Sequence, residues 1–171
     1  FSPFYKTDKP ILAIQPHGGP EGLGYQYSWT RDVPSPIVNE VLEYYKESHT
    51  IIHIKRQDQI IYPDTLQALD GFRSIAILLQ LSDKRLLIDS FAQHMAAALN
   101  LKSTVCWVST KPEVFGYKLH DNVKAEPFTK EPDLTTAAYN PFNLAQDIHS
   151  IPYNDLNEVF ITDKIVTSLN S

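Results

Sequence analysis

The chain has 171 residues, of which 43% are hydrophobic and 20% are charged, and its formal net charge at neutral pH is −5. These values are typical of one folded globular domain and exclude a disordered chain. The acidic balance argues against nucleic acid as the main partner, because phosphate binding favours a basic surface. No apolar run approaches the roughly 20 residues of a membrane-spanning helix, so no transmembrane segment is expected.

The first third of the chain predicts a strand, a helix and a second strand. Residues 10–16 form a short apolar run that predicts a buried strand, and the glycine-containing segment after it predicts a loop. Residues 34–48 carry apolar side chains at helical spacing, with Ser35 as the candidate N-cap. The β-branched stretch "TIIHIK", residues 50–55, predicts the second strand.

The middle of the chain continues this alternation. Residues 70–83 are apolar nearly all round and predict a helix packed between layers. A third strand is expected at residues 85–89, a helix at residues 90–100 and a fourth strand at residues 104–110. Strands that alternate with helices predict an α/β fold, specifically a Rossmann-like three-layer α/β/α arrangement around a parallel sheet.

The last third of the chain has weaker signals. A further strand is expected at residues 122–126, but residues 111–152 are rich in Pro, Asp, Asn and Thr and predict a long irregular loop region. Residues 153–171 recover helical spacing and predict a C-terminal helix. We expect residues 1–171 to form a single domain.

Two further features concern the context of the chain. It begins with Phe1 and its single methionine is Met95, which predicts that the chain is part of a longer protein, the C-terminal part. Its single cysteine, Cys106, lies in an apolar run and cannot form an internal disulfide. We expect Cys106 to be buried as a small hydrophobic side chain, which fits a reducing compartment.

The strongest site signal is the segment "LLIDSFAQH". It places Asp89 at the end of a predicted strand and Ser90 at the N-cap of the next helix. Ligands of open parallel sheets bind beyond the carboxyl ends of the strands, and the free amides from Phe91 onward suit a phosphate. His94 follows one helical turn later. Together with an acid for hydroxyl groups, this pattern suits a nucleotide-sugar, whereas the alternative is that Asp89 and Ser90 are ordinary helix caps.

Other candidates are less specific. His17, Gly18 and Gly19 follow the first predicted strand and form either part of the phosphate site or a tight turn. His49 and His53 bracket a strand, where residues four apart are separated by about 13 Å, too far for a metal pair. We therefore predict no metal site.

The segment "LLIDSFAQHMAAALNLKSTVCWVSTKPEVFGY" resembles the C-terminal signature of the ADP-heptose:lipopolysaccharide heptosyltransferase family, glycosyltransferase family nine. In that signature an apolar strand precedes Asp-Thr-Gly-x-x-His, an Ala-rich helix, another apolar strand and a turn of small residues. Asp89, Ser90 and His94 occupy the Asp, Thr and His positions. The loop "QPHGG" is similar to the loop after the first strand of the family's C-terminal half.

The resemblance implies the donor-binding half of a bacterial GT-B glycosyltransferase, which needs neither a metal nor a cofactor. In this interpretation Asp89 binds sugar hydroxyls, Ser90 and the Phe91 amide bind phosphate, and His94 supports the site. The acceptor, a glycan or glycolipid, would bind an N-terminal half that this chain lacks, so no catalytic residue is assigned. The family's role in lipopolysaccharide synthesis implies a cytoplasmic location with peripheral membrane association.

The chain also departs from the family pattern. Phe91 replaces a glycine, which restricts how closely a phosphate can approach the backbone. The family's basic residue before a tryptophan is missing near Trp29, where Arg31 is the nearest cation. These departures favour an alternative, a non-catalytic nucleotide-sugar-binding or scaffold module of the same fold. A third hypothesis is an unrelated flavodoxin-like domain in which Asp89 and Ser90 are plain caps.

Overall fold

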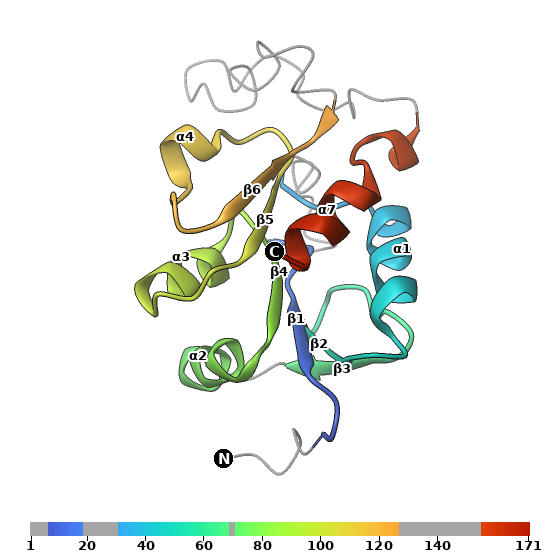
Figure 1. Cartoon of the computed structure of the whole chain (residues 1–171), viewed down its shortest axis with the longest axis vertical. Coiled ribbons are helices and arrows are strands. Elements are labelled where there is room, and N and C mark those ends of the chain that lie inside the picture. The colour runs from blue at the N-terminus through green and yellow to red at the C-terminus, as the bar shows by residue number, and fades with distance from the viewer. Residues whose placement is uncertain (1–6, 19–30, 69–70, 127–154) are drawn as a thin grey trace.

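The computed structural model describes residues 7–18, 31–68, 71–126 and 155–171. Its centre is a parallel six-stranded sheet with the strand order β3-β2-β1-β4-β5-β6 (Figure 1). The strands are β1 (Ile11–Ile14), β2 (Thr50–Ile54), β3 (Thr65–Ala68), β4 (Lys84–Ile88), β5 (Thr104–Trp107) and β6 (Asp121–Lys124). This is the Rossmann order, which confirms the predicted fold class. A flavodoxin-like sheet has the order 2-1-3-4-5, so that hypothesis is wrong.

The four central strands form because their apolar runs are covered on both faces of the sheet. Strands β1 and β5 are buried along their whole length, and β2 and β4 are buried after their first residue. The edge strands differ: β6 alternates between half-buried and exposed positions, and β3 buries only Ala68. Strand β3 was not predicted, because "TLQA" is short and lacks an apolar run; it forms through its parallel pairing with β2.

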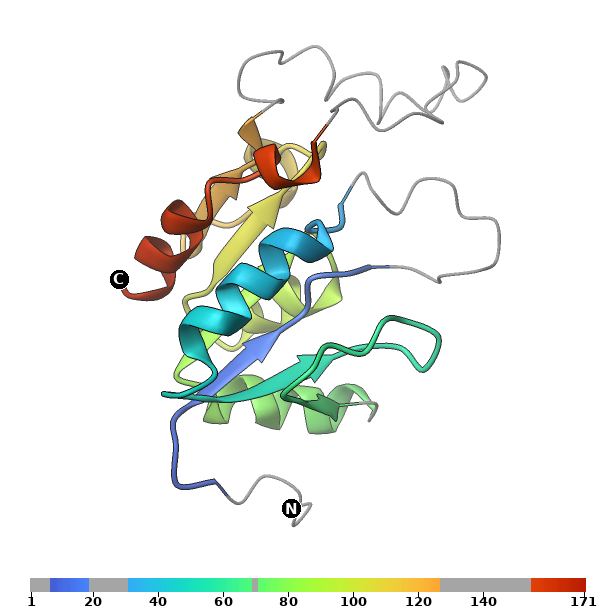
Figure 2. The same ribbon diagram turned by 90° about the vertical axis from the view of Figure 1, so that its right-hand side faces the viewer.

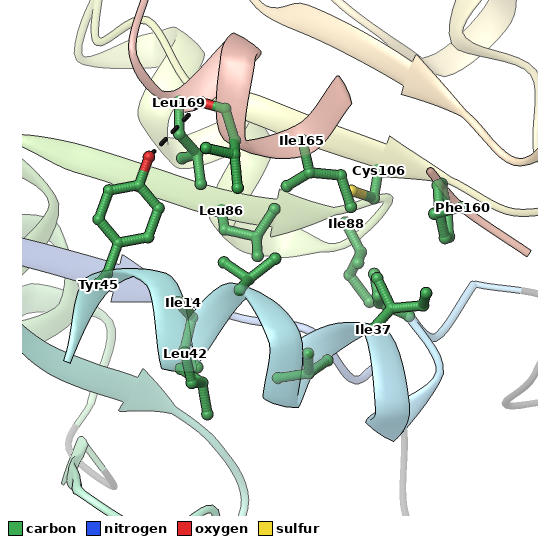
Figure 3. Packing of buried hydrophobic residues seen from close by; sticks show 14 of the residues in the cluster. Ile14, Ile37, Leu42, Tyr45, Leu86, Ile88, Cys106, Phe160, Ile165 and Leu169 are labelled. Carbon is green, nitrogen blue, oxygen red and sulfur yellow. Dashed lines mark hydrogen bonds between the residues drawn. The ribbon is translucent and has the colours of Figure 1, made fainter. Parts of the chain in front are cut away.

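Helices cover the two faces of the sheet (Figures 1 and 2). Helices α1 (Ser35–Tyr45) and α7 (Thr162–Leu169) lie on one face, and α2 (Phe72–Leu81) and α3 (Phe91–Ala98) lie on the other. Figure 3 shows the hydrophobic core on the first of these faces, where side chains of α1 pack against residues of the strands and of α7. The Tyr45 hydroxyl reaches α7 and donates to Asn170 Oδ1 at 3.0 Å. Burial raises the pKa of Tyr45 to about 12.

Two helix predictions need correction. Ser35 is not the N-cap of α1: the cap is Pro34, and Ser35 is the first helical residue. The two prolines that flank Ser35 favour this start, since proline tolerates the first turn of a helix. Helix α2 is not packed between layers either. It buries one side, and Phe72 and Leu81 are exposed, because no further layer of the described chain covers its outer face.

The C-terminal third also differs from expectation. The predicted loop region 111–152 contains helix α4 (Pro112–Phe115), and its residues 127–152 lie outside the described ranges. The strand expected at residues 122–126 is confirmed as β6, which begins one residue earlier. The helix expected at 153–171 is divided into a 3₁₀ turn, η3 (Leu156–Glu158), and α7. The chain turns between them because Val159 and Phe160 are buried in the core while Ile161 is exposed.

Polar side chains are closely paired at the amino edge of the sheet, where the strands begin. Arg85 donates to the carbonyls of Leu79 at 2.7 Å and Lys102 at 3.0 Å, and also to the Ser82 carbonyl. Lys84 Nζ donates to the Leu169 carbonyl at 2.6 Å. These bonds join α2, the start of β5 and the end of α7 to strand β4.

Candidate functional site at the carboxyl edge of the sheet

The order in which strands are added to the sheet reverses between β1 and β4. These two strands are neighbours in the sheet although β2 and β3 lie between them in sequence. In sheets of this order ligands bind at this point, beyond the carboxyl ends of the two strands. We call the loops that follow these ends, residues 15–18 and 89–91, the β1–β4 junction. The loops touch: a Cβ on Gly18 would lie 3.2 Å from Ile88 Cδ1 and 3.8 Å from Ser90 Oγ. A side chain at Gly18 would thus crowd Ile88, while Ser90 lies at ordinary contact distance.

Asp89 and Ser90 do not behave as ordinary caps. Asp89 is only 8% exposed, and within the described ranges its carboxylate forms neither a hydrogen bond nor an ion pair. Ser90 is the N-cap of α3, as predicted, but its side chain makes no capping hydrogen bond. Its Oγ instead accepts a bond from Gln15 Nε2 at 3.4 Å. The first-turn amides of α3 are thus left without a side-chain cap beside an unpaired carboxylate.

Phe91 and His94 point to other parts of the molecule. The half-buried Phe91 ring lies edge-to-face against Phe72 at the start of α2, with the ring centres 5.4 Å apart. His94 is exposed, and its Nδ1 lies 3.0 Å from the Tyr117 hydroxyl in the segment after α4. The contacts of His94 therefore connect α3 to that segment, and its role beside Asp89 stays a prediction.

The loop after β1 is held by Asp32. The amide of Gly18 donates to Asp32 Oδ1 at 2.8 Å, and His17 Nδ1 lies 3.5 Å from Asp32 Oδ2. The other ring nitrogen of His17, Nε2, lies 2.7 Å from the hydroxyl of Tyr62, and the rings stack. His17 therefore positions the loop by contacts on both sides of its ring.

No described contact assigns the remaining predicted residues, Gly19 and Arg31, to the β1–β4 junction. Gly19 lies outside the described residues, as do Tyr27, Ser28 and Trp29. Arg31 is half-buried and forms no ion pair with any residue of the described ranges. Nothing in its contacts assigns it to the β1–β4 junction.

Sequence reasoning missed two residues at the end of β2. His53 is fully buried, and neither ring nitrogen has a hydrogen-bond partner. Burial, the charge of His17 and that of Lys55 lower the pKa of His53 to about 3, so the ring is neutral at neutral pH. Lys55 follows β2 directly and is 8% exposed. The reasoning that selected Asp89, a polar residue directly after a buried strand, would also have selected Lys55.

Unpaired polar atoms recur along this edge. Gln15 Oε1, after β1, and Thr110 Oγ1, after β5, are both buried without a partner. Buried polar atoms are normally paired, so each such atom needs an explanation. Their position beside the β1–β4 junction is the position at which a bound ligand would pair them.

A pocket of about 460 Å³ lies at the opposite, amino edge of the sheet, between α7 and the starts of β5 and β6. Four of its lining residues, Lys102, Asp121, Ser168 and Ser171, have side-chain partners. Lys102 Nζ lies 3.0 Å from Asp121 Oδ2, the Ser171 hydroxyl donates to the same carboxylate at 2.6 Å, and the hydroxyls of Thr104 and Ser168 are 2.7 Å apart. These groups need no ligand, so we do not regard this pocket as the functional site.

The described residues include no group of three or more His, Cys, Asp or Glu side chains that could hold a metal ion. Among the helices of the described ranges, none combines the length and the apolar character needed to cross a membrane.

Comparisons with known proteins agree with this fold. No protein-family model matches the chain, and no curated protein matches it significantly. The solved glycosyltransferase of family 9 from Veillonella parvula is 8% identical, with a TM-score of 0.60 over 98% of this chain and 47% of its own. The Escherichia coli heptosyltransferase WaaC, solved with ADP, is 15% identical, with a TM-score of 0.54 over 70% of this chain and 39% of its own.

A third solved structure, the E. coli ADP-heptose heptosyltransferase II, is 15% identical, with a TM-score of 0.51 over 70% of this chain and 40% of its own. The chain thus spans less than half the length of each of these three proteins. It has the α/β Rossmann-like fold of part of a GT-B glycosyltransferase.

Proposed function

We propose that this chain is the donor-binding domain of a glycosyltransferase that uses a sugar linked to a nucleoside diphosphate. The observation that carries the proposal is Asp89, a carboxylate that is 8% exposed and has no partner in the described part of the chain. The Asp89 oxygens are not among the polar atoms that are sealed from solvent without a partner, so a ligand can reach them, and sugar hydroxyls are donors that would pair with them. The uncapped amides at the start of α3 would bind the diphosphate beside it.

Transfer would require the other half of the protein. An acceptor hydroxyl would attack the anomeric carbon of the sugar, a base from that half would take its proton, and the start of α3 would stabilise the departing diphosphate. WaaC was solved with ADP, which supports a nucleoside diphosphate as the ligand class. The resemblance to heptosyltransferases supports a bacterial lipopolysaccharide or cell-surface glycan as the product. It also supports a cytoplasmic location with peripheral membrane association.

A second candidate, a nucleotide-sugar-binding or scaffold module without catalysis, is favoured by Phe91. Its ring lies against Phe72 at the first turn of α3, where the family has a glycine. A residue with a Cβ at this position restricts how closely a phosphate can approach the backbone, compared with glycine. Donor binding with no transfer by the full-length protein would support this candidate.

The test is a thermal-shift and calorimetry screen against ADP, UDP, GDP and CDP, each with and without a sugar. A ligand at ~100 times its dissociation constant adds about 2.7 kcal/mol of stability. We expect one nucleotide family to bind, and Asp89→Ala and Asp89→Asn to weaken sugar-nucleotide binding at least about tenfold while the fold is kept. Unfolding of both variants, or unchanged affinity, would contradict the role of Asp89.

A matched control is Asp83→Asn at the amino edge. Asp83 Oδ2 accepts a bond from the Ile11 amide at 2.8 Å, so this carboxylate has a structural partner. The Asp83 variant should lose stability and keep its ligand affinity. The Asp89 variants should keep their stability and lose ligand affinity.

A further inference from the structure

Lys55 lies at the carboxyl edge of the sheet, beside the loop after β1. His53 pairs with Ile14 in the register of β2 and β1, so two residues later Lys55 lies level with Pro16. Its amide still donates to the Ala68 carbonyl of β3, at 3.3 Å. Because side chains alternate along a strand, Lys55 shares the α1 face of the sheet with His53. The side chain therefore begins next to the β1–β4 junction.

No described residue balances the charge of Lys55. The residue is 8% exposed, and its ammonium forms no hydrogen bond or ion pair within the described ranges. The adjacent His53 is neutral, and the charge of Lys55 helps to lower its pKa. The Asp32 carboxylate accepts a hydrogen bond from the Gly18 amide and lies 3.5 Å from His17 Nδ1, which forms no hydrogen bond in the described part of the chain. A buried cation without a partner is costly, so its retention needs a compensating anion.

Lysine often buries its alkyl stem and leaves the ammonium in water. The Lys55 ammonium is not among the polar atoms that are sealed from solvent without a partner, so a ligand can reach it. What distinguishes Lys55 from an ordinary surface lysine is its surroundings. The ring nitrogens of His53, on the same face of β2, are buried without a partner, and Gln15 Oε1 is likewise unpaired just after the neighbouring strand β1.

We propose that Lys55 binds an oxyanion of the ligand, a phosphoryl or carboxylate oxygen, and supplies the positive charge that the segment before Trp29 lacks. The inference rests on the proposed donor site and adds a specificity residue to it. In dinucleotide-binding sheets of this order an acidic residue follows β2 and binds ribose hydroxyls, whereas a cation there accommodates a phosphate. Because Lys55 makes the end of β2 cationic, we expect a negatively charged group of the ligand to lie on the β2 side of the β1–β4 junction.

The experiment compares the unmodified chain with Lys55→Met, Lys55→Gln and Lys55→Arg by calorimetry. The probes are inorganic pyrophosphate, the nucleoside, the nucleoside diphosphate, and nucleoside-diphosphate sugars with a neutral and with an acidic sugar. We expect the Met and Gln variants to bind the nucleoside as before and to lose about ten- to a hundredfold in affinity for the oxyanion ligands. Lys55→Arg should keep most of the affinity.

The probes separate the sources of the oxyanion. A loss for pyrophosphate and for every diphosphate assigns Lys55 to the diphosphate. A loss confined to the acidic sugar assigns it to a carboxylate. Equal affinities of the unmodified chain and the Met variant for all ligands would overturn the inference and leave the donor proposal standing. Lys55-dependent pyrophosphate binding without any nucleotide binding would support the oxyanion site and contradict the donor proposal. No binding by the unmodified chain would overturn both.

Stability supplies an independent readout. Removing an unpaired buried charge should leave the midpoint of thermal unfolding unchanged or raise it in Lys55→Met. Lys84→Met is the matched control, because the Lys84 ammonium donates to the Leu169 carbonyl at 2.6 Å and lies over the Tyr45 ring. That variant should lower the midpoint. If the Met and Gln variants of Lys55 both fail to fold, Lys55 is a structural residue and the inference is wrong.

Discussion

The two edges of the sheet differ in how completely their described polar groups are paired. At the amino edge, Arg85 donates to three carbonyls, Lys84 to one, and Asp121 is bound by Lys102 and Ser171. The same strands end at the carboxyl edge in Asp89, Lys55 and His53, for which no described residue supplies a hydrogen bond or ion pair.

Both edges are built from the same strands in the same fold, so the difference is not imposed by topology. Buried polar groups destabilise a protein unless they are paired. The amino edge contributes to stability, whereas the carboxyl edge retains groups that no described residue satisfies. The unequal pairing of the described polar groups at the two edges supports the carboxyl edge as the proposed ligand site.

The largest effect should come from Arg85→Met, which removes the central donor of the amino edge. Three carbonyls lose a charged partner, and we expect a loss of about 3 kcal/mol or more in the free energy of unfolding, measured with urea. The control is Arg56→Met, because Arg56 forms an exposed pair with Asp58 and should cost less than about 0.5 kcal/mol. If Arg85→Met and Arg56→Met lower the free energy of unfolding by similar amounts, the buried bonds of Arg85 stabilise the fold no more than an exposed ion pair does.

The second effect concerns pH at the carboxyl edge. The pKa of His53 is about 3 in the folded chain and 6.5 as its ordinary value. The unfolded chain therefore binds more protons between these values. The contribution of His53 to stability is complete above pH 6.5 and is lost as the pH falls toward 3. Between pH 7 and pH 4.5 this loss is about 2 to 3 kcal/mol.

His53→Leu should remove most of this pH dependence, which urea unfolding at several pH values would measure. A smaller slope should remain, because burial also lowers the pKa of His49 and of His120. If the variant and the unmodified chain lose stability in parallel as the pH falls, His53 is not buried in its neutral form.

The smallest effect should come from Ser90→Ala. A capping serine contributes about 1 kcal/mol, but the Ser90 side chain makes no capping bond, so we expect a loss below about 0.5 kcal/mol. Asp155→Ala is the control, because the Asp155 side chain accepts a bond from the Asn157 amide at 2.9 Å and caps η3. If Ser90→Ala lowers the free energy of unfolding as much as Asp155→Ala does, Ser90 is an ordinary helix cap.

The fold was largely predictable from the sequence, because the central strands are continuous apolar runs that no other pattern in the chain resembles. Strand β3 was not predictable, since "TLQA" becomes a strand only by pairing with β2. The turn between η3 and α7 was missed because helical spacing continues across it, while the burial of Phe160 interrupts the helix.

The candidate site was predictable in position and less so in detail. Because Asp89 and Ser90 follow a predicted strand, the sequence identified Asp89 as a candidate site residue and Ser90 as the N-cap of the next helix. Whether these groups have partners depends on residues distant in sequence, such as Gln15, which bonds Ser90. The same limit applies to Lys55 and His53, because their lack of partners is a property of the tertiary structure.

Cys106 lies in the centre of the sheet, paired with Ile88 in the register of β5 and β4, just below the carboxyl edge. It is fully buried, and burial raises the pKa of its thiol, so the folded protein should not react with thiol reagents. The chain has no other cysteine. The rate at which a thiol reagent modifies the chain therefore reports how often the core between the sheet and helices α1 and α7 opens. A ligand that holds the carboxyl edge closed would slow that reaction, and no engineered label is needed to observe it.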